Sequence, residues 1–122
     1  TERVLRAMGN RLFNILAHPT GRLIDKRAPA ELDLERVLEG ARERGCHLEI
    51  NAQPERLDLD DTHARMAKEI GVKLAISSDA HATAGLATLR FGIDQARRAW
   101  LGPDDVLNTR PWSELEKLLE RS

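Results

Sequence analysis

Three short apolar runs, at residues 12–18, 46–51 and 72–78, divide the chain. Each run is too short for a buried helix, and its length and composition predict a buried strand. Polar residues do not alternate cleanly with apolar ones, which is typical of parallel strands that are covered on both faces. A fourth, shorter strand is predicted at residues 106–108.

Amphipathic segments separate these runs. Apolar residues at helical spacing predict a helix after each of the three strands, and one at each end of the chain. Asp33 has the residue type and position of an N-cap, and Gly45 and Gly71 have those of the glycine that ends a helix. Gly92 is expected to be a weak point in a helix over residues 86–101. The alternation of strands and helices predicts an α/β fold.

Length and composition fit a globular domain, or part of one. The chain has 122 residues, 41% hydrophobic and 32% charged, with a net charge of −1 that neither requires nor forbids a nucleic-acid partner. Cys46 is the one cysteine and is expected to be a small buried side chain, which fits a reducing cytoplasm. No apolar run approaches the roughly 20 residues that cross a bilayer, so no membrane partner is expected.

Polar side chains follow the predicted strands where each strand ends. In parallel α/β folds the functional site lies beyond the carboxyl ends of the strands. His18 ends the first strand, Glu49 or Asn51 the second, and Asp79 and His81 the third. We therefore expect these side chains to meet at one rim of the sheet.

Asp79 and His81 are the strongest candidates for metal ligands. They are two residues apart, just past a strand, and small neighbours leave room for a shared ion. A carboxylate oxygen and an imidazole nitrogen together suit Zn²⁺, Mn²⁺ or Fe. The alternative is structural, with Asp79 capping the following loop and His81 making local hydrogen bonds.

The other candidates have open alternatives. His18 could be a ligand, a general acid or base, or a core residue with satisfied hydrogen bonds. Arg22 could clamp a phosphate, and with Lys26 and Arg27 it forms a basic cluster that could contact a phosphate backbone, although such clusters are usually solvated.

Glu49 and Asn51 share one face of the second strand, where polar side chains need partners. They could orient metal ligands, hold substrate, or form a purely structural hydrogen-bond network.

Five blocks in order, "LAHPTGRL", "LEINAQPERLDL", "ISSDAHATAGL", "ARRAWL" and "VLNTRP", resemble the C-terminal part of a PHP (polymerase and histidinol phosphatase) domain. The nearest resemblance is to the PHP domain of bacterial family X DNA polymerases, from about Leu12 onward. It implies a distorted β/α barrel with up to three divalent metal ions at its rim. His18 matches the histidine of the third ligand motif, Asp79 and His81 match the fourth, and Arg22 and Asn51 match positions with substrate or supporting roles.

The sequence also departs from this pattern, because the H-x-H pair and the other early ligands of the family are absent. Residues 1–122 are therefore expected to be the C-terminal portion of one incomplete PHP domain, without its N-terminal half and without the polymerase core. Open strand edges in such a piece predict self-association or a need for the missing half.

The resemblance implies a function for the intact parent protein. It would be a metal-dependent phosphoesterase acting on DNA, with 3′–5′ exonuclease or end-processing activity in repair, and the piece alone would be inactive. One alternative is a small-molecule phosphatase of the histidinol-phosphate type. Another is a PHP remnant that has only a structural role.

Overall fold

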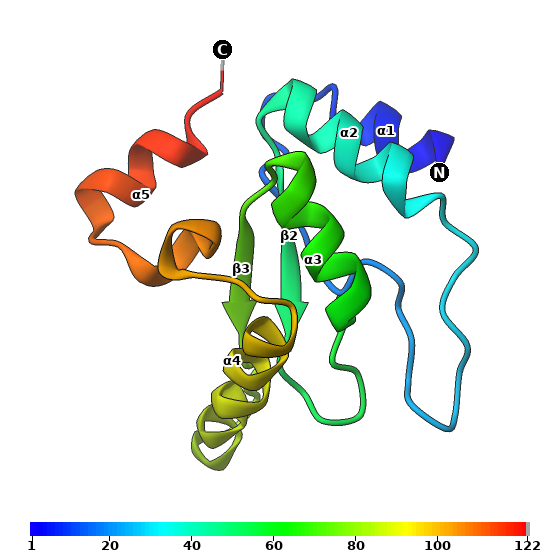
Figure 1. Ribbon diagram of the computed structural model, residues 1–122, viewed down its shortest axis with the longest axis vertical. Coiled ribbons are helices and arrows are strands. Elements are labelled where there is room, and N and C mark those ends of the chain that lie inside the picture. Colours follow the sequence, from blue (N-terminus) through cyan, green and yellow to red (C-terminus); the bar gives the residue numbers. More distant parts are fainter. Residues whose placement is uncertain (122) are drawn as a thin grey trace.

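A sheet of three parallel strands forms the centre of the protein, in a computed structural model that describes residues 1–121 (Figure 1). The strands β1 (Ile15–Leu16), β2 (His47–Asn51) and β3 (Leu74–Ser77) lie side by side in chain order. Leu48 of β2 is opposite one leucine of each neighbouring strand, which sets the register. The predicted α/β class, with parallel strands alternating with helices, is confirmed.

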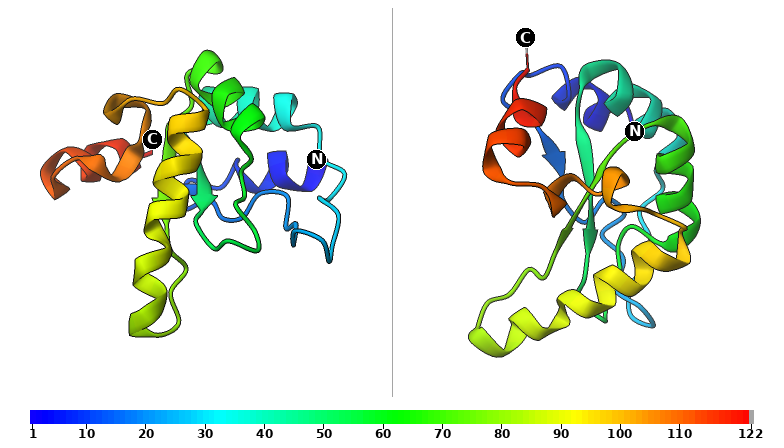
Figure 2. Two further views of the ribbon diagram at one scale, coloured as in Figure 1. Left: turned by 60° about the horizontal axis from the view of Figure 1, so that its bottom comes forward. Right: turned by 60° about the vertical axis from the view of Figure 1, so that its left-hand side comes forward.

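Helices lie on both sides of this sheet (Figure 2). They are α1 (Glu2–Ala7), α2 (Leu34–Arg44), α3 (Asp61–Ile70), α4 (Leu89–Arg98) and α5 (Trp112–Leu119), with the 3-10 helices η1 (Thr83–Thr88), η2 (Pro103–Asp105) and η3 (Leu107–Thr109). The connecting helices α2 and α3 lie on one side of the sheet and α5 lies on the other (Figure 2). Successive parallel crossovers of one hand place their helices on the same face in this way. Within residues 1–121 no helix is long and apolar enough to cross a membrane.

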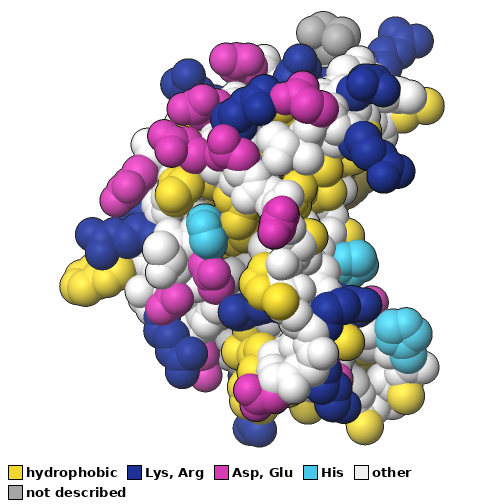
Figure 3. Space-filling view, turned by 90° about the vertical axis from the view of Figure 1, so that its right-hand side faces the viewer, with side chains coloured by type: hydrophobic (Ala, Val, Ile, Leu, Met, Phe, Trp, Pro, Cys, Tyr) yellow, Lys and Arg dark blue, Asp and Glu magenta, His cyan; other side chains and the backbone are white. Residues whose placement is uncertain are grey.

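The outward faces of α1 and α2 are densely charged. Glu2 and Arg36 form an ion pair of 2.6 Å between the two helices. Acidic and basic side chains alternate over the upper part of the face drawn in Figure 3. Because both partners of this ion pair are mostly exposed, it stabilises the fold only slightly.

Caps at both ends define the two connecting helices. The Asp33 and Asp60 side chains each accept a hydrogen bond from the backbone N–H three residues on, at 3.2 and 2.8 Å. These hydrogen bonds make Asp33 the N-cap of α2 and Asp60 the N-cap of α3. Gly45 and Gly71 follow the helices with φ of 70° and 101°, a left-handed conformation that glycine adopts without steric cost. The predicted ends of α2 and α3 are confirmed.

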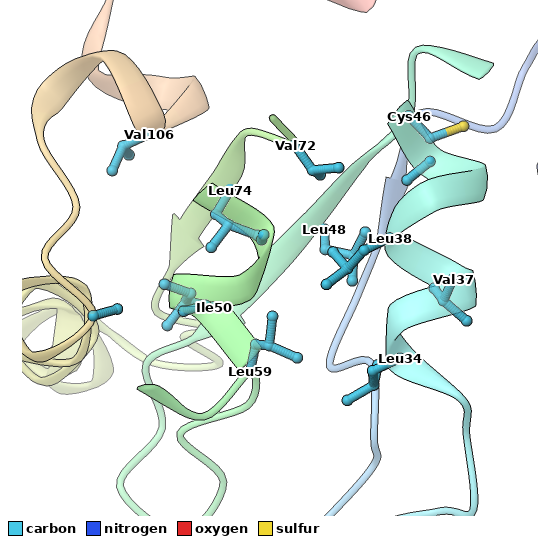
Figure 4. Close-up of a cluster of buried hydrophobic side chains, with 14 of the residues drawn as sticks. Leu34, Val37, Leu38, Cys46, Leu48, Ile50, Leu59, Val72, Leu74 and Val106 are labelled. Atoms are coloured by element: carbon cyan, nitrogen blue, oxygen red, sulfur yellow. The ribbon is translucent and has the colours of Figure 1, made fainter. Parts of the chain in front are cut away.

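Alternation along β2 separates an apolar face from a polar one. Leu48 and Ile50 are fully buried and belong to the hydrophobic core, and Figure 4 shows Leu38 of α2 directed toward Leu48. Glu49 and Asn51 occupy the intervening positions and so point to the other face. Cys46 is 2% exposed and packs with the core, as predicted.

The first strand is shorter and less buried than predicted. Residues 12–18 supply only the two residues of β1, while Leu12 and Ile15 are 82% and 38% exposed. Among the described residues β2 is the only strand beside β1, so the other edge of β1 has no neighbouring strand. An apolar edge strand without a second neighbour leaves its outer side chains exposed, and this explains the failed prediction of burial.

The prediction of a fourth strand at residues 106–108 is wrong. Val106 makes one isolated parallel bridge to Leu74, and η3 follows directly. The Asn108 side chain takes the place of a strand, because its Oδ1 accepts from the Ile76 N–H at 3.0 Å and its Nδ2 donates to the Ile76 carbonyl at 2.8 Å. One side-chain amide thus satisfies the backbone groups of the β3 edge.

Gly92 is not a weak point of its helix. It is buried within α4, and a Cβ at this position would lie 2.6 Å from Ile76 Cγ2 and 2.8 Å from Ala52 Cβ. Glycine is therefore required for the close approach of α4 to the sheet. The N-terminal part of the predicted helix 86–101 forms the end of η1 instead.

Candidate functional site

A hydrogen-bond network joins the carboxyl ends of all three strands. The His18 N–H, after β1, donates to Glu49 Oε1 at 2.8 Å, and Glu49 Oε2 accepts from the Ser77 hydroxyl of β3. Asn51 Nδ2 donates to Asp79 Oδ2 at 3.1 Å and lies 3.4 Å from Glu49 Oε1. Glu49 and Asn51 therefore connect the segment that carries His18 with the segment that carries Asp79.

Asp79 and His81 form a local unit at the end of β3. Asp79 has a left-handed backbone with φ of 51°, which aspartate tolerates better than most residues, and both side chains are exposed. His81 Nδ1 lies 2.8 Å from the Asp79 carbonyl oxygen. A carbonyl can only accept, so the proton is on Nδ1 and the lone pair of neutral His81 is on Nε2. Metal-binding histidines commonly have this arrangement.

A surface pocket of about 390 Å³ opens beside this unit. Gln53 supports its wall, because its side-chain amide donates to the carbonyls of Ser78 and Asp79 at 2.5 and 3.4 Å. Residues with carboxylate and imidazole groups, which bind cations, and one with a guanidinium group, which binds anions, line this pocket. The lining residues are Gln53, Glu55, Arg56, Asp79, His81, Ala82 and Gly85.

His18 belongs to the same rim but does not line this pocket. Its side chain is exposed rather than turned into the core, and its φ is 27°. Its N–H is held by Glu49, and its carbonyl accepts from the Gly21 N–H at 3.0 Å. Such a strained backbone persists where the surrounding structure determines it from several sides.

The two predicted substrate-binding residues both have protein partners. Arg22 Nε and Nη2 donate to the carbonyls of Arg56 and Leu57 at 2.8 and 2.6 Å. Asn51 is 0% exposed, and its Oδ1 accepts from the Gln53 N–H at 3.1 Å. This favours the orienting role for Asn51 among those left open by the sequence, and direct substrate contact by either residue stays a prediction.

Burial shifts the pKa of two groups at the opposite end of the sheet. Desolvation lowers the pKa of His47, although the hydrogen bond from its Nε2–H to the Leu118 carbonyl, at 3.1 Å, opposes this. Desolvation raises the pKa of the Cys46 thiol, and the nearby arginines only partly oppose this. Burial and a raised pKa are the features of a structural rather than a reactive thiol.

The donors at the rim suit a metal ion individually, but they do not form a closed coordination shell. Within residues 1–121, no group of three or more His, Cys, Asp or Glu side chains is placed to hold one ion. The predicted ligands His18, Asp79 and His81 share one rim and one hydrogen-bond network, without converging on a common point.

Basic side chains lie near the histidines on the lower part of the face in Figure 3, where a Lys or Arg side chain separates two histidines. Of the predicted cluster, Arg27 donates from Nε to the Gly21 carbonyl at 2.8 Å, and Lys26 is exposed. The cluster therefore lies on the loop that follows His18 along the chain.

Three residues of the rim were not predicted from the sequence, namely Gln53, Asp58 and Ser77. Gln53 and Ser77 hold the ends of β2 and β3 through the contacts above. Asp58 is 0% exposed and accepts hydrogen bonds from the loop after His18. It lies in the stretch Asp-Leu-Asp-Asp, residues 58–61, whose composition predicts the start of a helix and does not indicate that one of its carboxylates is buried.

The sequence is similar to that of a protein named a DNA polymerase/3′-5′ exonuclease and to those of proteins named probable phosphatases, and no protein-family model matches the chain. The chain is 41% identical over 121 residues to the DNA polymerase/3′-5′ exonuclease PolX of Bacillus subtilis (strain 168), which is 99% of this chain and 21% of PolX. It is 30% identical over 127 aligned positions to a protein named a probable phosphatase from Thermoanaerobacter sp. (strain X514), covering 49% of it. A probable phosphatase of Caldanaerobacter subterraneus is 33% identical over 87 residues. The chain thus spans about a fifth to a half of these relatives.

Proposed function

We propose that residues 1–122 are the C-terminal portion of a PHP domain, and that the intact parent protein is a metal-dependent phosphoesterase acting on DNA ends. The observation that carries the proposal is the joining of three strand ends by Glu49 and Asn51, which gathers His18 and Asp79 at one rim. The similarity to a protein named a polymerase and 3′-5′ exonuclease supports DNA as the substrate. A single reduced thiol, buried Cys46, fits action in the cytoplasm.

His18, Asp79 and His81 would hold divalent ions, with Mn, Zn or Fe suited to these donors. Such ions lower the pKa of a bound water and stabilise negative charge on phosphate oxygens. The residues of this chain fix the donors: Asn51 orients the Asp79 carboxylate, and the Asp79 carbonyl sets the tautomer of His81. Arg22 and its neighbouring basic residues would bind the phosphate backbone.

The proposal concerns the intact protein, because no group of three or more His, Cys, Asp or Glu side chains within residues 1–121 is placed to hold a metal ion. The missing ligands would come from the N-terminal half of the same barrel. The open edge of β1, with Ile15 and Leu12 exposed, supports a neighbouring strand there, and in isolation it favours self-association.

Two alternatives have their own support. The similarity to proteins named phosphatases favours a phosphatase that acts on small phosphate monoesters, although it rests on lower identity. The lack of a complete ligand group within residues 1–121 favours a structural remnant without catalysis. The first differs from the leading proposal in the substrate that is hydrolysed, and the second in that no substrate is hydrolysed.

The test is Asp79→Ala in the intact protein, with Asp104→Ala, at an exposed position of η2, as the control. Metal-stimulated hydrolysis of a labelled DNA 3′ end should be abolished by Asp79→Ala and retained by the control, while nucleotide incorporation is unchanged in both. Unchanged nuclease activity would reject the site. Hydrolysis of histidinol phosphate but not of DNA would support the phosphatase. Less than one tightly bound metal ion per intact chain, with neither reaction, would support the structural role.

A further inference from the structure

Two loops at the rim are bonded together along their length. We name them the rim loops: residues 18–24, which follow β1, and residues 55–58, which follow β2. Arg22 binds two carbonyls of the second loop, and the Ile24 N–H donates to the Glu55 carbonyl at 2.6 Å. The first rim loop therefore takes its shape from the second.

Asp58 is the buried centre of this contact. It is 0% exposed, and Oδ2 accepts from the backbone N–H groups of Thr20 and Gly21 at 3.0 and 2.8 Å, with Oδ1 at 3.2 Å from Thr20 N. No ion pair to Asp58 is present within residues 1–121. A buried carboxylate is costly unless it is well bonded, so these two N–H groups are a principal compensation for its charge.

Asp58 fixes the turn that begins at His18. The Gly21 N–H, which Asp58 binds, also donates to the His18 carbonyl at 3.0 Å and closes the turn. On the other side of His18, its own N–H is bound by Glu49. His18 is thus held in its left-handed conformation, φ 27°, by two carboxylates from the β2 side of the rim.

We propose that Asp58 is a positioning residue, which holds the imidazole of His18 at the reacting centre by binding the Thr20 and Gly21 N–H groups. This inference rests on the proposed function. It concerns His18 rather than Arg22, because Arg22 has its own bonds to the Arg56 and Leu57 carbonyls. Loss of the Asp58 carboxylate should therefore disturb the chemical step more than substrate binding.

The first test is Asp58→Asn in the intact protein, with exposed Asp104→Asn as the matched control. Hydrogen exchange, read by mass spectrometry on the peptide covering residues 18–24, should become about tenfold faster in Asp58→Asn and stay unchanged in the control. The kcat for metal-stimulated DNA hydrolysis should fall by about 10–100-fold with KM nearly constant. Unchanged exchange in this peptide, or an unchanged kcat, would overturn the proposal.

A second pair of variants tests the turn without removing a buried charge. Gly21 and Gly45 have φ of 65° and 70°, and an added Cβ meets nothing within 4 Å at either position. Alanine should therefore strain the backbone equally at both sites. The two variants should therefore lower thermal stability to the same extent. Gly21→Ala should also lower kcat, whereas Gly45→Ala, at the end of α2, should leave kcat unchanged. Equal effects on kcat would reduce the turn to a structural role and refute the proposal.

These results separate the inference from the function on which it rests. If the unsubstituted protein does not hydrolyse phosphoesters, the proposed function fails, and exchange in residues 18–24 still decides whether Asp58 holds the turn. If the unsubstituted protein is active and the folded Asp58→Asn and Gly21→Ala variants are equally active, the positioning role alone fails.

Discussion

Replacing Asn51 by Ala removes the link between β2 and Asp79. Asn51 is 0% exposed, so no water replaces its amide directly. Three contacts are lost: Nδ2 to Asp79 Oδ2 at 3.1 Å, Nδ2 to Glu49 Oε1 at 3.4 Å, and the Gln53 N–H to Oδ1 at 3.1 Å. The Gln53 N–H and the Asp79 carboxylate are left with fewer partners.

The magnitude follows from the type of each contact. The bond to Asp79 involves a charged acceptor but an exposed one, so it contributes about 1.5 kcal/mol, the low end for such bonds. The neutral bond from Gln53 adds about 1 kcal/mol, and the long contact to Glu49 is neglected. We therefore expect Asn51→Ala to lower the free energy of unfolding by about 2–3 kcal/mol. Loss of the orientation of Asp79 should also lower metal affinity of the intact protein by about 10–100-fold.

Urea unfolding followed by tryptophan fluorescence measures the first effect, and metal titration calorimetry on the intact protein measures the second. Asn10→Ala is the control, because the exposed Asn10 side chain only accepts a local bond from the Leu12 N–H at 2.9 Å. It should cost less than about 1 kcal/mol and leave metal binding unchanged. If Asn51→Ala costs no more than Asn10→Ala, or leaves metal affinity intact, then Asn51 does not orient Asp79.

Three further predictions concern the scaffold. Because burial lowers the pKa of His47, the unfolded chain takes up the proton at higher pH than the folded chain, so the contribution of His47 to stability is complete above about pH 6.5 and falls as the pH decreases from there. Urea unfolding at about pH 7.5 and 5.5 should show a smaller loss of stability for His47→Leu than for the unsubstituted protein. Equal losses in the two proteins would contradict this prediction. Gly92→Ala should destabilise by about 1–3 kcal/mol through contact with Ile76, although alanine favours helix, and a higher melting temperature would refute this packing. Arg121 donates to four carbonyls near the ends of α1 and α2, at 2.6–2.9 Å. In urea unfolding, Arg121→Ala should lower the free energy of unfolding by about 1–2 kcal/mol, and Arg121→Lys should not restore this stability, because an ammonium lacks the planar fork of a guanidinium. Full stability of the lysine variant would show that the charge alone suffices.

The local signals in the sequence were sufficient for α2, α3, β2 and β3. Their caps, glycine stops and apolar spacing all depend on residues within one element, and Asp33 and Gly45 act as predicted. β1 and the expected fourth strand depended on neighbours instead. Whether Ile15 is buried is decided by what lies beyond the sheet edge, and whether residues 106–108 form a strand is decided by the Asn108 side chain competing for Ile76.

The rim followed from the sequence because parallel strands end on the same side. That rule identified His18, Asp79 and His81 as candidate site residues before any contact was known. It does not predict the bonds that fix their orientation. Asp58 lies 38 residues from Thr20 along the chain, and nothing in its own surroundings distinguishes it from the exposed Asp61. Long-range backbone contacts of this kind leave no local pattern.

The polar network and the hydrophobic core are built from alternate residues of one strand, so neither can move without the other. Leu48 and Ile50 anchor β2 in the core, and the residues between and after them, Glu49 and Asn51, are thereby fixed on the opposite face. A shift of one residue in the register would exchange the two sets, burying carboxylate among leucines and exposing leucine at the rim. Core packing therefore sets the positions of the groups that hold His18 and Asp79. For this reason, a core substitution that shifts β2 should disturb the rim even though it touches none of the proposed ligands.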